Sequence, residues 1–264
     1  MGVAKMGRVL SSAVILGLYL FLLAPIFIVF IVSFSADPFL AFPPSAWGFK
    51  WYGEILRNPE FIRAFRLSFS IALVVTVIGL VVGISAAFVL GRFHFRGREG
   101  ILSFFTAPLL IPSIVLGLSL LLVFLPLGLA STFHGLVLGH LLVVLPYIIR
   151  ILVVAFQTMP KEYEEAGLSL GATPWVVFWR VMLPLVTPSL VASAALAFIL
   201  SFDEVVISLF LVGPRLKTLP VAIYEYVEFR TDPQIAALSV LLIFLSILIV
   251  LIVERTVGVF RALR

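Results

Sequence analysis

Two adjacent acids, Asp203 and Glu204, lie within the run Leu185 to Val212, which contains no other charged residue. An ionised carboxylate at the centre of a membrane helix costs about 2.5 to 3.5 kcal/mol, so such acids usually face water or a partner group. Their charge would attract an organic ammonium ion, and a carboxylate can also relay protons. Equally, the pair could cap a broken helix or bind a basic residue of another subunit. The sequence leaves two roles open, a place on a translocation pathway and a structural role.

Other residues that could do chemistry are sparse. His134 and His140 are six residues apart and fall on different faces of a helix, with no third ligand nearby, which argues against a metal site. The chain contains no cysteine, so it can form neither a disulfide nor a thiolate metal site. It has no Gly-x-x-x-x-Gly-Lys-Ser/Thr loop and cannot bind ATP by that route. We therefore expect no catalytic residues, no cofactor of its own and no enzyme activity.

The elements that must position these residues are hydrophobic helices. Hydrophobic residues make up 62% of the chain and charged residues 12%, and the mean hydropathy is +1.25. A soluble protein of this size needs more charged side chains to cover its core. The composition therefore predicts an all-α polytopic membrane protein in contact with lipid. Its basic residues lie in short clusters beside apolar runs, a pattern typical of orientation signals and not of nucleic-acid binding.

Uncharged runs predict six transmembrane helices in a single domain, residues 1–264. The first run, residues 9–36, is too long for the apolar region of a signal peptide, whereas a spanning helix needs about 20 residues. The uncharged run 100–149 is long enough for two crossings, with a turn at 126–132 where Pro, Gly, Ser and Thr gather. The expected spans are about 9–35, 67–91, 101–125, 133–156, 188–212 and 234–253.

The distribution of Lys and Arg predicts the orientation of these spans. Seven such residues fall in the first, third and fifth loops between the expected spans, where nearby acids nearly balance their charge. Eleven fall at the termini and in the second and fourth loops. Because cytoplasmic loops carry an excess of Lys and Arg, we expect both termini in the cytoplasm. The eleven are Lys5, Arg8, Arg92, Arg96, Arg98, Arg150, Lys161, Arg180, Arg255, Arg261 and Arg264.

One polar interval, residues 159–184, interrupts the apolar second half of the chain. Pro160 suits a first helical turn, and the following acids complement the dipole at a helix N-terminus. Gly171 suits a left-handed C-terminal cap. Thr173 and Pro174 can start a second short helix, which we expect to end near Leu183 and Pro184, before the fifth span. The acids are Glu162, Glu164 and Glu165.

The first of these short helices has an apolar face with a small centre. Tyr163, Ala166, Gly167 and Leu170 fall at positions i, i+3, i+4 and i+7. Small residues allow another surface to approach the backbone closely. Such a helix can lie on the membrane surface, dock on its own bundle or enter a groove of a partner protein. The residues alone leave these three possibilities open.

The spacing in this interval resembles the EAA loop of ABC importer permeases. That pattern is Glu-Ala-Ala, three residues, Gly, nine residues, Ile, one residue, Leu-Pro. The spacing matches throughout, with two departures, Gly167 for the second Ala and Val181 for Ile, that keep small or apolar character. Similar stretches over nearly the whole chain, such as Ser201 to Val206, place it nearest the spermidine and putrescine permeases. The matching positions are Glu165, Ala166, Gly167, Gly171, Val181, Leu183 and Pro184.

The resemblance implies a type I ABC importer permease of the bacterial inner membrane, with interval 159–184 as its coupling segment. It implies a cytoplasmic ABC ATPase dimer that binds ATP and Mg, a second permease subunit, and an external substrate-binding protein. Ala166 and Gly167 would form the close-contact face, Gly171 would turn the chain, and Leu183 with Pro184 would anchor the second short helix. The implied cargo is a polyamine or a related small organic solute.

Two other classes of protein remain open. An ion-coupled secondary transporter would use Asp203 or Glu204 as a proton or sodium relay, but such proteins usually contain repeated halves, and none is detected here. A membrane scaffold that transports nothing would need only the docking helix. Uptake that depends on ATP while the membrane potential is held separates the importer from both.

Overall fold

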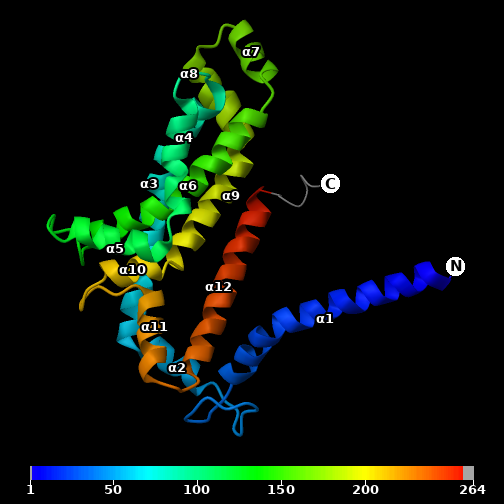
Figure 1. The fold of residues 1–264 in the computed structure, drawn as a ribbon, viewed down its shortest axis with the longest axis vertical. Helices are drawn as coiled ribbons and strands as arrows, with labels where there is room; N and C mark the ends of the chain where they lie inside the picture. The colour runs from blue at the N-terminus through cyan, green and yellow to red at the C-terminus, as the bar shows by residue number, and fades with distance from the viewer. Residues whose placement is uncertain (1, 258–264) are drawn as a thin grey trace. The chain divides into compact units, whose positions relative to one another are not determined.

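The computed structural model describes residues 2–257 and groups them into two compact units. The first unit comprises residues 2–62 and 223–245, and the second comprises residues 63–222 and 246–257. Arg261 and Arg264, which were counted for the orientation, lie outside the described residues. The described residues form helices and no β-strand, which confirms the predicted all-α class (Figure 1).

Five helical segments of the described chain are long and apolar enough to cross a membrane, and a bent pair of helices makes a sixth if it is counted as one span. The long elements are α1 (Gly2–Ser33), α3 (Pro59–Arg92), α6 (Phe133–Thr158), α9 (Leu183–Phe202) and α12 (Gln234–Val257). The shorter ones are α2 (Lys50–Arg57), α4 (Arg98–Thr106), η1 (Ala107–Leu110), α5 (Ser113–Phe124), α7 (Glu162–Ser169), α8 (Pro174–Val177), η2 (Phe178–Met182), α10 (Val206–Leu211) and α11 (Leu219–Phe229).

The third predicted span is not one helix. We expected a continuous helix over residues 101–125, but the run α4–η1 and the following α5 meet at an angle of 103°. Pro112 has no N–H to donate, and it holds Ile111 in an extended conformation with φ −93° and ψ 129°. The helix therefore ends before Pro112 and starts again in a new direction. Hydropathy does not register this bend, because the residues next to Pro112 are apolar on both sides.

The fifth predicted span, residues 188–212, is also wrong in its limits. α9 ends at Phe202, and α10 is a separate short helix. At its other end, α9 continues from α8 through a π turn, η2, so the second short helix does not end near Leu183 and Pro184 as expected. In this turn the Leu183 N–H donates to the Phe178 carbonyl, five residues back. The wider turn accommodates Pro184, which has no N–H to donate.

The core of the second unit includes the contact of α3 with α6, where Ile148, Leu152 and Phe156 are fully buried. α3 approaches α6 closely because it presents two glycines there. A Cβ atom at Gly83 would lie 2.5 Å from Ile148 Cγ2, and one at Gly79 would lie 2.7 Å from Ile148 Cδ1. Small residues four positions apart allow this approach between membrane helices.

In the first unit, the loop after α1 is fastened at two points. The Tyr52 hydroxyl donates to Ser33 Oγ at 2.8 Å, which joins α2 to the end of α1. The hydroxyl and the backbone N–H of Ser45 both donate to the Asp37 carboxylate. These hydrogen bonds hold the pKa of Asp37 below its usual value, because they stabilise the ionised carboxylate.

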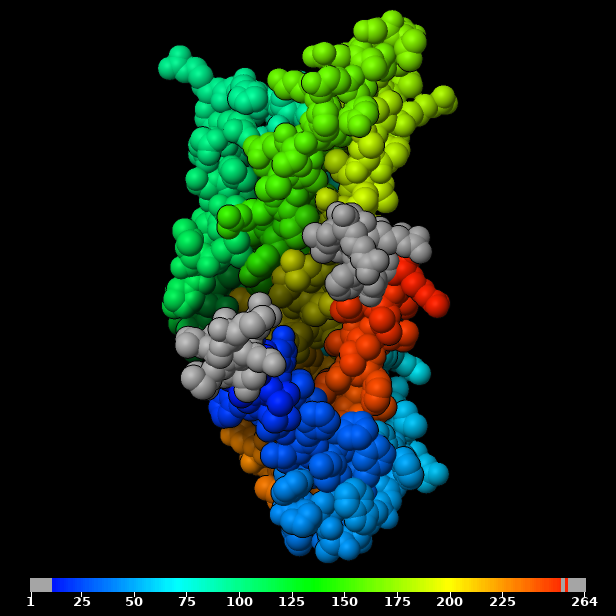
Figure 2. All heavy atoms as spheres, turned by 90° about the vertical axis from the view of Figure 1, so that its right-hand side faces the viewer, coloured from blue at the N-terminus to red at the C-terminus, as the bar shows by residue number. Residues whose placement is uncertain are grey.

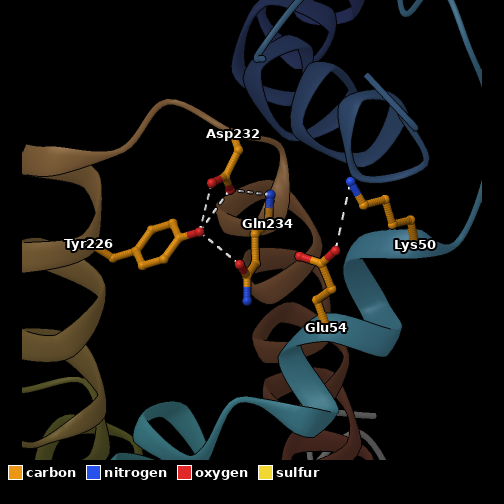
Figure 3. Close-up of polar contacts among 5 residues, drawn as sticks. All are labelled: Lys50, Glu54, Tyr226, Asp232 and Gln234. Atoms are coloured by element: carbon orange, nitrogen blue, oxygen red, sulfur yellow. Dashed lines mark hydrogen bonds and ion pairs between the residues drawn. The ribbon is translucent and has the colours of Figure 1, made fainter. Parts of the chain in front are cut away.

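The turn between α11 and α12 is closed by Tyr226 (Figure 3). Its hydroxyl oxygen lies 2.8 Å from Asp232 Oδ2 and 2.7 Å from Gln234 Oε1. Asp232 Oδ1 accepts the backbone N–H of Gln234 at 3.1 Å. Figure 3 also shows the ion pair between Lys50 and Glu54, one helical turn apart on α2 at 3.7 Å. This second contact is solvent-exposed and contributes little stability.

We expect the Tyr226 turn to loosen at alkaline pH. Burial, followed by the hydrogen bond and charge of Asp232, raises the pKa of Tyr226 from 10.0 to about 12. Its unfolded hydroxyl ionises near pH 10, so the stabilisation is complete below that pH and is lost as the pH rises through 12. The tyrosinate absorbance difference between the wild type and Tyr226→Phe should follow this late ionisation. A difference centred at pH 10 would contradict the assignment.

Candidate functional site

The polar interval folds as a small helical cap at one end of the second unit, where α7 and α8 lie side by side (Figure 1). Its yellow-green spheres form the upper edge of the view in Figure 2. Gly171 follows α7 with φ +82°, the left-handed conformation expected at this position. Thr173 Oγ1 accepts the N–H of Val176 at 3.4 Å and so begins α8. The left-handed cap after the first short helix and the start of the second therefore lie where the sequence places them, whereas α7 begins at Glu162, two residues after Pro160.

Arg92 joins this cap to the membrane helices. Its Nη2 and Nε atoms donate to Glu164 Oε2 on α7, at 2.6 and 3.1 Å. Its Nη1 atom donates to the carbonyls of Phe156 and Met159 at the end of α6, at 3.2 and 3.0 Å. The Arg92 side chain is only 6% exposed. One guanidinium at the end of α3 thus fixes both the end of α6 and the start of α7.

Two open hollows border the junction between α6 and α7. A hollow of about 220 Å³ reaches from Thr158 and Tyr163 to Val186 on α9, and another of about 260 Å³ lies between Arg92 and Lys161. Side chains therefore pack incompletely on two sides of this junction. Arg92 is the principal polar link that sets the position of α7 on the second unit.

We expect Arg92→Ala to destabilise the second unit by about 2 kcal/mol, because it removes charge-assisted bonds and leaves the Glu164 carboxylate and two helix carbonyls without their donor. Thermal unfolding of the purified chain measures the loss, and hydrogen exchange should rise chiefly in α7. Arg96→Ala is the matched control, since Arg96 lies exposed in the same basic cluster. Equal protection of α7 in the two variants would contradict the role of Arg92.

The two small residues of α7 lie in different surroundings. Gly167 is half-buried and faces α8, where a Cβ atom on it would lie 3.0 Å from Val177 Cγ2. Ala166 is exposed, and Leu170 is 89% exposed. Gly167 is therefore used in the contact between the two short helices, while Ala166, Leu170 and the exposed Tyr163 form the outward surface. Glu165 is exposed beside them.

The last three positions of the motif lie in the continuous helix that follows α8. Val181 belongs to the π turn η2, and Leu183 begins α9. Both side chains are partly buried and pack against the core of the second unit, whereas Pro184 is exposed. The contact of Leu183 with the core suits an anchoring role. Leu183 would anchor the start of α9 and not the end of a separate short helix, because α8 continues through η2 into α9.

The two acids Asp203 and Glu204 lie at the corner between α9 and α10, and they have different surroundings. Glu204 Oε1 accepts the N–H of Ile207 at 3.0 Å, so this carboxylate caps α10. Asp203 is exposed, and its carboxylate has no hydrogen bond or ion pair within the described part of the chain. Glu204 therefore caps α10, whereas Asp203 has no polar partner within the described residues.

A buried histidine beside this corner was not assigned a role from the sequence. His140 is 1% exposed, and its Nδ1 and Nε2 atoms lie 2.9 and 3.0 Å from the hydroxyls of Ser201 and Ser208. His134, also on α6, is exposed. The two histidines differ completely in surroundings, and His140 contacts hydroxyl groups on both sides of the break between α9 and α10.

Comparison with known proteins identifies the family. Residues 79–261, more than half of the chain, match the family described as "Binding-protein-dependent transport system inner membrane component". The putrescine transport system permease protein PotI of Escherichia coli K12 is 35% identical over 232 residues, which are 85% of this chain and 82% of the relative. The spermidine/putrescine transport system permease protein PotC of the same strain is 29% identical over 245 residues, or 93% and 92%.

A solved structure shows the same fold. The crystal structure of a bacterial ABC transporter that imports the acidic polysaccharide alginate contains a chain that matches with a TM-score of 0.73 at 20% identity. The match covers 98% of both chains. The overall helical arrangement is thus the fold of type I ABC importer permeases. The chain is a multi-pass inner-membrane permease of the binding-protein-dependent transport system family.

Proposed function

We propose that this permease carries a polyamine such as putrescine or spermidine, or a related small organic solute, in an ATP-driven importer. PotI and PotC, whose names state these cargoes, are similar to it over most of its length. The carboxylate of Asp203 has the charge that an ammonium group requires, and it has no other partner within the described residues. Glu204 would add to the local negative potential while it caps α10.

The coupling segment 159–184 would transmit the work of a separate ABC ATPase dimer, which binds ATP and Mg. The observation that carries this proposal is the construction of α7. Arg92 holds this helix against the ends of α3 and α6, while its other face, with Leu170 at 89% exposure, stays uncovered by the chain itself. A helix that is bonded to the membrane helices and keeps a free apolar face suits a force-transmitting contact.

The complete importer would contain further chains. The six expected spans would form one permease domain, with both termini and the coupling segment in the cytoplasm. A second, different permease subunit would complete the pathway, and an external substrate-binding protein would deliver the cargo. Closure of the ATPases would then rock the two permeases between inward-open and outward-open states.

An uptake assay tests the proposal, with the complex that copurifies with this chain reconstituted in liposomes. With the loaded binding protein outside and ATP inside, labelled putrescine or spermidine should accumulate, and accumulation should stop when ATP is depleted while the membrane potential is clamped. Uptake that persists on the potential alone would instead support an ion-coupled transporter relying on Asp203 or Glu204. A complex without an ATPase and without uptake of any solute would support a scaffold.

A further inference from the structure

The corner between α9 and α10 is bridged by one imidazole ring. Ser201 lies in the last turn of α9, Ser208 lies in α10, and the break at residues 203–205 separates them. The two ring nitrogens of His140 contact both hydroxyls, at 2.9 and 3.0 Å. All three side chains are at most 1% exposed. A residue of α6 therefore holds both ends of the broken helix at once.

Apolar packing next to this bridge brings α6 and α10 close together. A Cβ atom at Gly139 would lie 2.6 Å from Leu211 Cδ1 and 3.0 Å from Ile207 Cγ2. Nothing larger than glycine therefore fits beside His140 without movement of α10. The polar bridge thus lies beside a close contact between α6 and α10.

Buried polar groups at such a contact determine its geometry more than they stabilise it. Burying an imidazole and two hydroxyls gains little free energy over apolar side chains of the same shape, because their bonds to water are lost. Hydrogen bonds are directional, however, and a fully satisfied buried network selects one arrangement among several that apolar packing would permit. A neutral imidazole suits this site, since one nitrogen donates and the other accepts, and each hydroxyl can take either complementary part.

We propose that His140 is a positioning residue, which holds the α9–α10 corner in a single geometry through Ser201 and Ser208. The corner carries Asp203, whose carboxylate is free within the described residues, and Glu204, which caps α10. His140 thereby sets where these acids stand relative to α6. For its effect on transport, the inference rests on the proposed function, in which the corner lies on the cargo pathway.

A set of variants separates positioning from simple burial. His140→Leu leaves two buried hydroxyls without their partner and should lower both thermal stability and uptake. The triple variant His140→Leu, Ser201→Ala, Ser208→Ala removes every polar member of the bridge, so its thermal stability should return close to that of the wild type. We expect its ATP-driven uptake to stay about tenfold low, because the corner is no longer held. His134→Leu, on an exposed site of the same helix, is the matched control and should behave as the wild type.

A distance measurement tests the same inference without any transport. The chain has no cysteine, so spin labels can be placed on single engineered thiols at the exposed positions Leu138 of α6 and Leu209 of α10. We expect a narrow distance distribution for the wild type and His134→Leu, and a broad or shifted one for the triple variant. A narrow, unshifted distribution in the triple variant would overturn the positioning role. If the distribution broadens while uptake stays normal, the corner is held by His140 but does not lie on the cargo pathway.

Discussion

Gly167→Glu should leave the chain assembled in its membrane complex and reduce cargo-stimulated ATP hydrolysis to the unstimulated level. A Cβ atom at position 167 already lies 3.0 Å from Val177 Cγ2, so a glutamate side chain must push α7 away from α8. The outward surface formed by Tyr163, Ala166 and Leu170 then no longer has the shape that its partner receives. ATP hydrolysis by the purified complex, with and without the loaded binding protein, measures the loss.

Gly167→Ala is the matched control for this prediction. The EAA pattern that the chain resembles has alanine at this position, and a shift of a few tenths of an ångström at Val177 makes room for one methyl group. We therefore expect coupled hydrolysis to be retained. If Gly167→Glu assembles normally and still responds to the loaded binding protein, then α7 does not transmit the signal.

Gly83→Leu should prevent stable packing of α3 on α6 and destabilise the second unit by about 3 kcal/mol or more, at the upper end of overpacking effects. Only 2.5 Å separates a Cβ atom at this position from Cγ2 of the fully buried Ile148. Ile148 lies in the core and cannot swing into solvent, so the helices themselves must separate. Thermal unfolding of the purified chain and its yield from the membrane report the effect.

Two further variants show whether the contact itself is responsible. Gly17→Leu makes the same exchange in α1, where no atom lies within 4 Å of the added Cβ atom, and should be tolerated. Ile148→Ala removes the atom that an added methyl group in Gly83→Ala would meet. The double variant Gly83→Ala, Ile148→Ala should therefore lose less stability than the two single variants lose together. Additive effects would mean that α3 and α6 are not in contact at Gly83.

Local signals made the polar interval predictable. Gly171 and Thr173 act within a few residues of themselves, so a left-handed cap and the start of the second short helix could be assigned from the sequence alone. The EAA spacing indicates the family of the segment, and the family match over residues 79–261 agrees with it. The expected coupling role followed from this interval, whereas the long apolar runs indicated only a membrane location.

The breaks in the membrane helices were harder to predict. Hydropathy averages over about 20 residues and treats Pro112 as one apolar residue among many, although it ends a helix. The π turn before Pro184 likewise allowed α8 and α9 to join where a stop was expected. A charge pair such as Asp203 and Glu204 inside an apolar run was the better signal, because the helix does break there.

Contacts between distant parts of the chain were not predictable from one sequence. Arg92 is 72 residues from Glu164, and His140 is 61 and 68 residues from its two serines. Arg92 is one of three arginines in a basic cluster, and neither its type nor its spacing distinguishes it from Arg96. Only the fold, by placing the ends of α3 and α6 beside α7, shows that Arg92 makes these contacts.

Cross-linking from position 170 tests most directly whether the coupling segment meets an ATPase. Leu170 is 89% exposed on α7, and Leu170→Cys introduces the only thiol in the chain. A short thiol-directed cross-linker applied to the intact complex should join this chain to an ATP-binding subunit, and the yield should change when ATP is added. Failure to join an ATPase in a complex that still imports its cargo with ATP would contradict the assignment of residues 159–184.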